Sequence, residues 1–221
     1  MGVTVYQFEH SPYCIPITRA LEALGVAFAV HNVSNADRSE IIRLTDGKYY
    51  QVPVLGHDGK IIYESSPVST DVAHYVDATF AKGRLFPAAH EGLQRIVVDH
   101  LENEVEGVTF RLVDPPYLRS ITDPAERVMI VRHKERKFGA GCVEAWAAQR
   151  AELSEAAKTL LEPYDLTLRH SPFLFGETPV YADFALFGIL GNLTYRDYNP
   201  LPNGLDALGQ WFARMQTFRF A

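Results

Sequence analysis

Apolar and polar positions divide the first eighty residues into short segments with two periods. Segments rich in β-branched and aromatic residues alternate with segments whose apolar residues recur every three or four positions, a pattern typical of strands alternating with amphipathic helices. The predicted strands are residues 3–8, 28–33, 52–55 and 60–63, and the predicted helices are residues 17–25, 39–44 and 67–80. The Asp58-Gly59 step suits a tight hairpin turn between the last two strands. This order predicts an α/β domain.

The rest of the chain has the apolar spacing of helices. Residues 81–90 mix glycine, proline and polar residues, which indicates a linker. Three helices are predicted after it, at residues 93–113, 124–138 and 143–161. The first should end at Asp114-Pro115-Pro116, because proline removes a helical hydrogen bond. We therefore predict an α/β domain at residues 1–80, a linker at 81–90 and an all-α helical domain at 91–221.

Composition and charge limit the class of protein. A chain of 221 residues that is 47% hydrophobic and 22% charged can form a packed core. A formal net charge of −6 argues against nucleic acid or an anionic membrane as a partner. No signal-like segment is present and no apolar stretch approaches the roughly 20 residues of a membrane span, so a cytoplasmic location is expected. Cys14 and Cys142 lie in segments of different character, which favours two free thiols.

Pro53 lies inside the apolar run Val52-Pro53-Val54-Leu55. Because proline cannot donate to a sheet ladder, this position needs a special arrangement. A cis Val52–Pro53 bond at the start of the strand is one solution. It would leave the Val52 N–H and C=O open to pair with an extended ligand, as another strand would. A trans proline at an ordinary strand start is the alternative.

Three motifs in a fixed order carry a family resemblance. Ser11-Pro12-Tyr13-Cys14 follows the first strand, Val52-Pro53-Val54-Leu55 forms the third, and Glu64-Ser65-Ser66 follows the fourth. With the elements between them, they resemble the thioredoxin-like domain of the cytosolic glutathione S-transferases, and the resemblance continues through the helical half. It implies an α/β thioredoxin-like domain followed by an all-α helical bundle, a homodimer, a role in detoxification, and glutathione as substrate or cosubstrate.

The resemblance also implies where glutathione binds. Pro53 matches a cis proline of the family, and the backbone of Val52 matches the one that pairs with the cysteinyl part of glutathione. Glu64 and Ser65 match residues that hold the γ-glutamyl end. Gln51 matches a polar residue that contacts the glycyl end, where Lys48 is a weaker candidate.

Physical chemistry agrees with the role implied for the Glu64-Ser65-Ser66 motif. The two serines would lie at the N-terminus of a helix beginning at Pro67, where free N–H groups favour a carboxylate. Glu64 could meet the ammonium group of the ligand. Simple capping of the helix by serine is the alternative.

Ser11 is the candidate catalytic residue. A free thiol has a pKa of about 8.5, so the protein must favour the thiolate, which a hydroxyl donor or a helix N-terminus can do. The resemblance places Ser11 where serine-type members carry their activating hydroxyl; a plain helix cap is the alternative. Cys14 matches the second cysteine of a Cys-Pro-Tyr-Cys pattern, but with serine first no internal disulfide can form. A reactive Cys14 and a buried, inert Cys14 both stay open.

Two positions depart from the family pattern. Pro16 lies where a helix-compatible residue is usual, so the helix either begins near Pro16 or has a distorted first turn, and either would change the distance from Ser11 to a bound thiol. Val180 replaces the usual capping serine or threonine before Asp183, so the reciprocal cap is absent or shifted to Thr178. The pocket for the second substrate is expected between the domains. Its candidate residues are Tyr13, Phe110, Arg111, Tyr117 and the cluster Arg132-His133-Lys134.

Together these features predict a glutathione S-transferase-like enzyme that activates the glutathione thiol for attack on an electrophilic small molecule. Proximity and thiolate activation would supply the rate, with no metal required. A glutathione-dependent isomerase, lyase or reductase on the same fold is the first alternative. A non-catalytic binding protein that kept the fold is the second.

Overall fold

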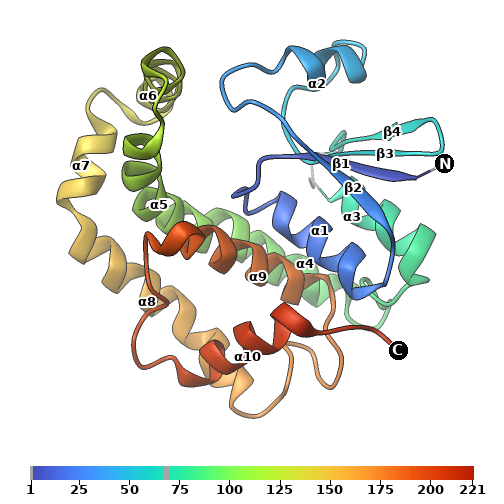
Figure 1. Cartoon of the computed structure of the whole chain (residues 1–221). Helices are drawn as coiled ribbons and strands as arrows, with labels where there is room; N and C mark the ends of the chain where they lie inside the picture. The colour runs from blue at the N-terminus through green and yellow to red at the C-terminus, as the bar shows by residue number, and fades with distance from the viewer. Residues whose placement is uncertain (1, 67–69) are drawn as a thin grey trace.

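The computed structural model describes residues 2–66 and 70–221, and its N-terminal half is built on a four-stranded sheet (Figure 1). The strands are β1 (Val3–Gln7), β2 (Phe28–Asn32), β3 (Val54–His57) and β4 (Lys60–Ile62). They lie in the order β2-β1-β3-β4, with β1 parallel to β2 and antiparallel to β3, and β3 antiparallel to β4. Asp58 and Gly59 both have positive φ, as a tight hairpin turn requires, which confirms the predicted turn.

Helices cover both faces of this sheet. They are α1 (Cys14–Ala23), α2 (Ser39–Leu44) and α3 (Asp71–Val76), with α3 continuing into the π-helical turn η1 (Asp77–Ala81). Val5 and Leu55 of the sheet are buried in one cluster with Leu21 of α1, whereas Val54 is buried in another with Ile41 of α2. The predicted α/β arrangement is confirmed. The predicted start of the third helix at Pro67 lies outside the described residues.

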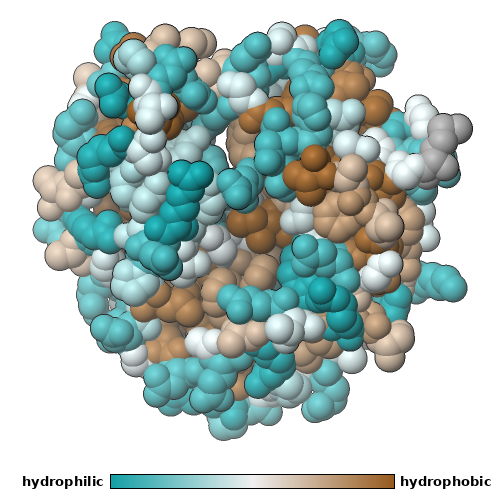
Figure 2. Space-filling model, in the orientation of Figure 1, coloured by the Kyte–Doolittle hydropathy of each residue, from teal (hydrophilic) through white to brown (hydrophobic). Residues whose placement is uncertain are grey.

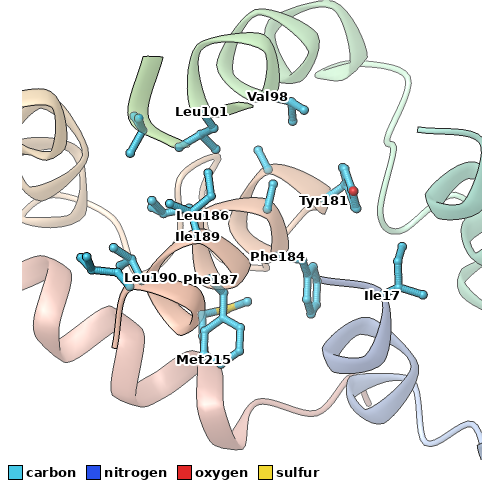
Figure 3. Packing of buried hydrophobic residues seen from close by; sticks show 14 of the residues in the cluster. Ile17, Val98, Leu101, Tyr181, Phe184, Leu186, Phe187, Ile189, Leu190 and Met215 are labelled. Carbon is cyan, nitrogen blue, oxygen red and sulfur yellow. The ribbon is translucent and has the colours of Figure 1, made fainter. Parts of the chain in front are cut away.

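The C-terminal half is helical (Figure 1). Its elements are α4 (Glu91–His100), η2 (Leu101–Val105), α5 (Glu106–Ser120), α6 (Pro124–Phe138), α7 (Cys142–Ala148), α8 (Arg150–Leu168), α9 (Tyr181–Leu193), η3 (Tyr195–Asp197) and α10 (Asp206–Thr217). Helix α9 is surrounded by the others, and its side chains are buried on every face (Figure 3). A helix that is apolar all round is the expected core of such a bundle. The predicted all-α domain is confirmed.

The predicted end of the first long helix at Asp114-Pro115-Pro116 is wrong. Helix α5 continues through both prolines to Ser120. Pro116 has no N–H to donate to the Leu112 carbonyl, but the buried side chain of Asn199 donates to that oxygen at 3.4 Å. A distant side chain thus replaces one of the hydrogen bonds that the prolines remove. The predicted helix 143–161 is in fact two helices, α7 and α8, which meet at Gln149.

Pro16 does not delay the start of α1. The helix begins at Cys14, and the Ser11 carbonyl accepts from the N–H groups of Cys14 and Ile15, both at 3.1 Å. Pro16 is therefore the third helical residue, where an N–H would have no partner inside the helix. The prediction of a helix starting near Pro16 is wrong for this reason.

Asp183 supplies its half of the cap of α9. Its carboxylate accepts from the Val180 N–H at 3.1 Å, the Leu174 N–H at 2.9 Å and the Trp211 Nε1–H at 3.0 Å. Val180 has no polar side chain, so the reciprocal half is missing, as expected. Within residues 2–66 and 70–221, no helix combines the length and apolar character of a membrane span.

Candidate active site

A first cavity of about 330 Å³ lies between the two halves of the molecule. Gln51, Val52, Pro53 and Glu64 line it from the α/β half. The helical half contributes side chains of η2, α5, α6 and α9, among them Glu102, Glu106, Phe110, His133, Lys134, Lys137, Phe138 and Tyr181. Four of the predicted binding residues are therefore brought together, although they come from two separate parts of the sequence.

The Val52–Pro53 peptide bond is cis, as predicted. Pro53 stands immediately before β3, so its missing N–H removes no bond from the ladder, which begins at Val54. Among the residues that the structure describes, none donates to or accepts from the Val52 backbone. Val52 lines the first cavity, so this open backbone edge borders space that an extended ligand could fill.

A second cavity of about 490 Å³ adjoins the first. Both cavities are lined by Tyr13, Gln51, Val52, Glu106, Phe110, His133 and Lys134. The rest of its lining combines aromatic side chains, among them Phe8, His10, Tyr50 and Tyr117, with aliphatic, polar and charged ones. The site therefore consists of two adjoining spaces, one beside Pro53 and one beside Ser11. Two adjoining spaces suit two ligands that are held side by side.

Ser11 lies at the second cavity, with 6% of its surface exposed. Its Oγ accepts from the Tyr13 N–H at 3.2 Å, one residue before the start of α1. The hydroxyl therefore organises the loop ahead of the helix and caps no N–H of the helix itself. Ser11 lines the second cavity alone, and Tyr13, whose N–H it accepts from, lines both cavities.

Cys14 is fully buried and lines neither cavity. Burial raises the pKa of its thiol to about 12, although hydrogen bonds with the Ser11 side chain and the Phe8 backbone oppose that shift. A thiol with so high a pKa forms almost no thiolate at neutral pH. The structure thus favours the inert alternative for Cys14 over the reactive one.

The Glu64-Ser65-Ser66 motif is already engaged by the protein's own groups. One oxygen of the Asp71 carboxylate accepts from the Ser65 N–H at 2.6 Å, the Ser65 hydroxyl at 3.0 Å and the Ser66 N–H at 2.7 Å. The Glu64 carboxylate accepts from the first two N–H groups of α3, those of Asp71 at 2.6 Å and Val72 at 3.3 Å. The serines therefore bind a carboxylate, but here it belongs to Asp71. Ser65 itself lines neither cavity.

Three carboxyl groups face the first cavity with raised pKa values. Burial is the largest cause for Glu64, Glu102 and Glu106, and it raises each pKa from 4.5 to about 7. Neighbouring carboxylates add to the effect at each position, whereas Lys134 and Lys137 oppose it at Glu106. Near neutral pH these groups are thus partly protonated, and they can act as hydrogen-bond donors as well as acceptors.

We expect stability to fall as pH rises through this range. A folded-state pKa of about 7 lies above the ordinary 4.5, so folding takes up protons between these values. The stabilisation is complete below pH 4.5 and is lost as pH approaches 7. Glu106→Gln should therefore stabilise the protein at pH 8, by a free energy on the order of 2 kcal/mol, and raise its melting temperature there. At pH 4.5 the same substitution should scarcely change the melting temperature. Glu104→Gln, an exposed control on the adjoining turn, should have the same small effect at both pH values; equal effects of the two substitutions would contradict the assignment.

Some of the residues predicted for the second-substrate pocket line a cavity, and others do not. Tyr13, Phe110 and the His133-Lys134 pair line both cavities, and Tyr117 lines the second. Three predicted side chains, those of Lys48, Arg111 and Arg132, line neither cavity.

Sequence reasoning missed Glu102 and Glu106 in the first cavity and Arg38 in the second. The two glutamates are four residues apart and so share one helical face, but only the packing of the halves shows which face meets the cavity.

Two sequence profiles match the chain. The profile of the glutathione S-transferase N-terminal domain matches residues 5–83. The profile of the glutathione S-transferase C-terminal domain matches residues 92–195. Together they span most of both halves. No curated protein sequence matches the chain.

Solved structures with the same fold cover nearly the whole chain. A glutathione S-transferase of Ceriporiopsis subvermispora in complex with glutathione has a TM-score of 0.81 and 17% identity, over 100% of this chain and 99% of its own. A glutathione transferase of Phanerochaete chrysosporium has a TM-score of 0.80 and 15% identity, over 100% and 98%. Glutaredoxin 2 of Salmonella typhimurium in complex with glutathione has a TM-score of 0.72 and 23% identity, over 98% and 95%. At sequence identities this low, the similarity of these structures to the chain shows a shared fold alone.

Proposed function

The chain belongs to the glutathione S-transferase family, and we propose that it binds glutathione and activates its thiol for attack on an electrophilic small molecule. The observation that carries this proposal is the pair of adjoining cavities, one beside cis Pro53 and the open Val52 backbone and one beside Ser11. Glutathione is polar and extended, and the first cavity borders the backbone edge with which an extended peptide can pair. Most electrophiles have an apolar part, and the second cavity offers it the rings of Phe8, His10 and Tyr117.

In this proposal glutathione would occupy the first cavity. The open backbone of Val52 would pair with the cysteinyl unit, with Pro53 holding the edge in place. Gln51 would contact the glycyl end, and Glu64 and Ser65 the γ-glutamyl end. The sulfur would then lie at the walls shared by the two cavities, within reach of the second substrate. Glutathione bound in related proteins of this fold supports the placement.

Ser11 would stabilise the thiolate by donating its hydroxyl proton in a hydrogen bond to the sulfur. A charge-assisted hydrogen bond of this kind favours the ionised thiol and lowers its pKa. The sulfur attacks the electrophilic carbon, a C–S bond forms, and the leaving group departs with its electron pair. The thiol proton passes to solvent. No covalent enzyme intermediate is needed, because both reactants are held side by side.

The rival functions are distinguished by their products. An isomerase would regenerate glutathione, a lyase would add it to or eliminate it from the substrate without displacing a leaving group, and a reductase would release oxidised glutathione. Reduction through Cys14 is disfavoured because that thiol is buried with a raised pKa. Conjugation of chlorodinitrobenzene, together with retention on immobilised glutathione, tests the proposal. Retention that survives the double substitution Glu64→Gln, Ser65→Ala would refute the assigned site, and retention without turnover would favour a binding protein.

Asp71 should compete with glutathione for Ser65. If the ligand's carboxylate takes the donors that now bind Asp71, Asp71→Ala should tighten glutathione binding by about tenfold, since bonds to charged groups are worth about 1.5–3 kcal/mol. Calorimetric titration measures this. In a protein that already carries Ser65→Ala, Asp71→Ala should increase the affinity for glutathione much less. An unchanged or weaker affinity for Asp71→Ala would show that the ligand's carboxylate binds elsewhere.

We also propose that the protein is a cytoplasmic homodimer with a detoxifying role, as the family membership suggests. Leu93 and Ile96 of α4 support the dimer, because these large apolar side chains are exposed by 60% and 66% on one helix. Light scattering of the purified chain gives the mass directly. A monomer at micromolar concentration would contradict the proposal.

A further inference from the structure

The second cavity offers an aromatic surface for its occupant. It is large enough for a drug-sized molecule, and the molecular surface is hollowed between α6 and α2 (Figure 2). Phe8, His10 and Tyr117 form one continuous wall, with the ring centroids of His10 and Tyr117 4.2 Å apart. Burial lowers the pKa of His10 to about 4, so its ring is neutral at physiological pH and acts as a further aromatic surface. A flat, conjugated occupant fits this wall.

The charges around the second cavity do not balance. Lys134 is paired with Asp114 at 2.6 Å, and Glu106, whose pKa is raised to about 7, is only partly ionised near neutral pH. Arg38 and Arg136 also line this cavity, and neither has an acidic partner within the part of the chain that the structure describes. The cavity therefore carries excess positive charge, which favours an anionic occupant.

Arg38 is held in place with part of its guanidinium unused. Its Nε and Nη2 donate to the Asn35 carbonyl and the Asn35 Oδ1 at 3.1 and 2.7 Å. The guanidinium carbon lies 4.0 Å from the centroid of the Phe8 ring. Nη1 is buried without an acceptor among the described residues. A fixed guanidinium that lacks an acceptor is suited to a carboxylate, which can take two N–H groups at once.

We infer that the second cavity selects electrophiles in which an aromatic ring carries a carboxylate, and that Arg38 binds that carboxylate. This inference rests on the proposed glutathione-dependent function. The ring packs against the wall of Phe8, His10 and Tyr117, and the carboxylate directs the electrophilic carbon toward the sulfur. For a halomethylbenzoate, the C–S bond forms as the carbon–halogen bond breaks, and the halide leaves with the electron pair.

The test compares reaction products as ligands, because binding does not depend on turnover. S-(carboxybenzyl)glutathione, as its meta and para isomers, is titrated calorimetrically against S-benzylglutathione. We expect one carboxylated isomer to bind about tenfold tighter than the neutral conjugate. Arg38→Gln should erase this preference while leaving S-benzylglutathione within twofold, and Arg38→Lys should restore only part of it. Arg43→Gln on the exposed side of α2 is the matched control and should change neither affinity.

The outcomes separate the two proposals. If both conjugates bind equally, or if Arg38→Gln weakens both alike, glutathione binding stands and the role of Arg38 is refuted. If neither conjugate binds the parent, the proposed function fails and the inference fails with it. Melting temperatures of the variants show whether any loss comes from unfolding.

Discussion

Ser11→Ala is expected to lower kcat/KM for conjugation by about 10- to 100-fold. The lost hydrogen bond to the thiolate is worth about 1.5–3 kcal/mol, and each 1.4 kcal/mol is a factor of ten in rate. The pKa of glutathione bound to the variant should move toward the free value of about 8.5. The ultraviolet absorbance of the thiolate, followed as a function of pH in the parent and the variant, measures this directly.

Tyr13→Phe is the matched control for Ser11. Tyr13 lies on the same loop and lines both cavities, so its hydroxyl is the other donor that could reach the sulfur. We expect Tyr13→Phe to leave the thiolate pKa close to that of the parent. If the thiol pKa of bound glutathione were unchanged in Ser11→Ala but raised in Tyr13→Phe, Tyr13 and not Ser11 would be the residue that stabilises the thiolate.

Gly188→Ala is expected to destabilise the protein by roughly 2–3 kcal/mol. Gly188 lies in α9, where a Cβ would come within 2.5 Å of the Pro16 side chain and closer still to the Pro12 carbonyl oxygen. The proline ring is rigid and the carbonyl is backbone, so neither can move aside cheaply. Thermal unfolding should show a melting temperature lower by about 5–10 °C.

The damage from Gly188→Ala should also reach the active site, because Pro12 directly follows Ser11 and Pro16 lies in the first turn of α1. Gly209→Ala in α10 is the control, since nothing lies within 4 Å of a Cβ there. It should stabilise the protein by about 0.5–1 kcal/mol, because alanine favours a helix more than glycine does. Equal melting temperatures for Gly188→Ala and the parent would show that α1 and α9 are not so tightly packed.

The strands and the hairpin between the last two of them could be predicted from local patterns. The β-branched and aromatic residues at 3–8 and the Asp58-Gly59 turn depend on neighbours along the chain. The cis bond before Pro53 was predictable from the proline at the start of an apolar run and from the family motif that this run matches. Each of these features depends on residues that lie close together in the sequence.

The errors and omissions involve contacts between distant residues. The side chain of Asn199 supports α5 through its prolines, and nothing near residue 115 indicates this. Asp71 takes the donors of Ser65 across several intervening residues, so the sequence shows the binding motif but not its occupant. Arg38 has no acidic partner among the residues that the structure describes, and this likewise depends on which carboxylates the fold brings near it.

A crystal structure with glutathione bound tests the central claim most directly. The account predicts the cysteinyl backbone paired with Val52, the sulfur at the walls shared by the two cavities within hydrogen-bond distance of the Ser11 hydroxyl, and the Asp71 carboxylate displaced from Ser65. Crystals grown in excess glutathione that show Asp71 still bound to Ser65 and the edge at Val52 empty would contradict it.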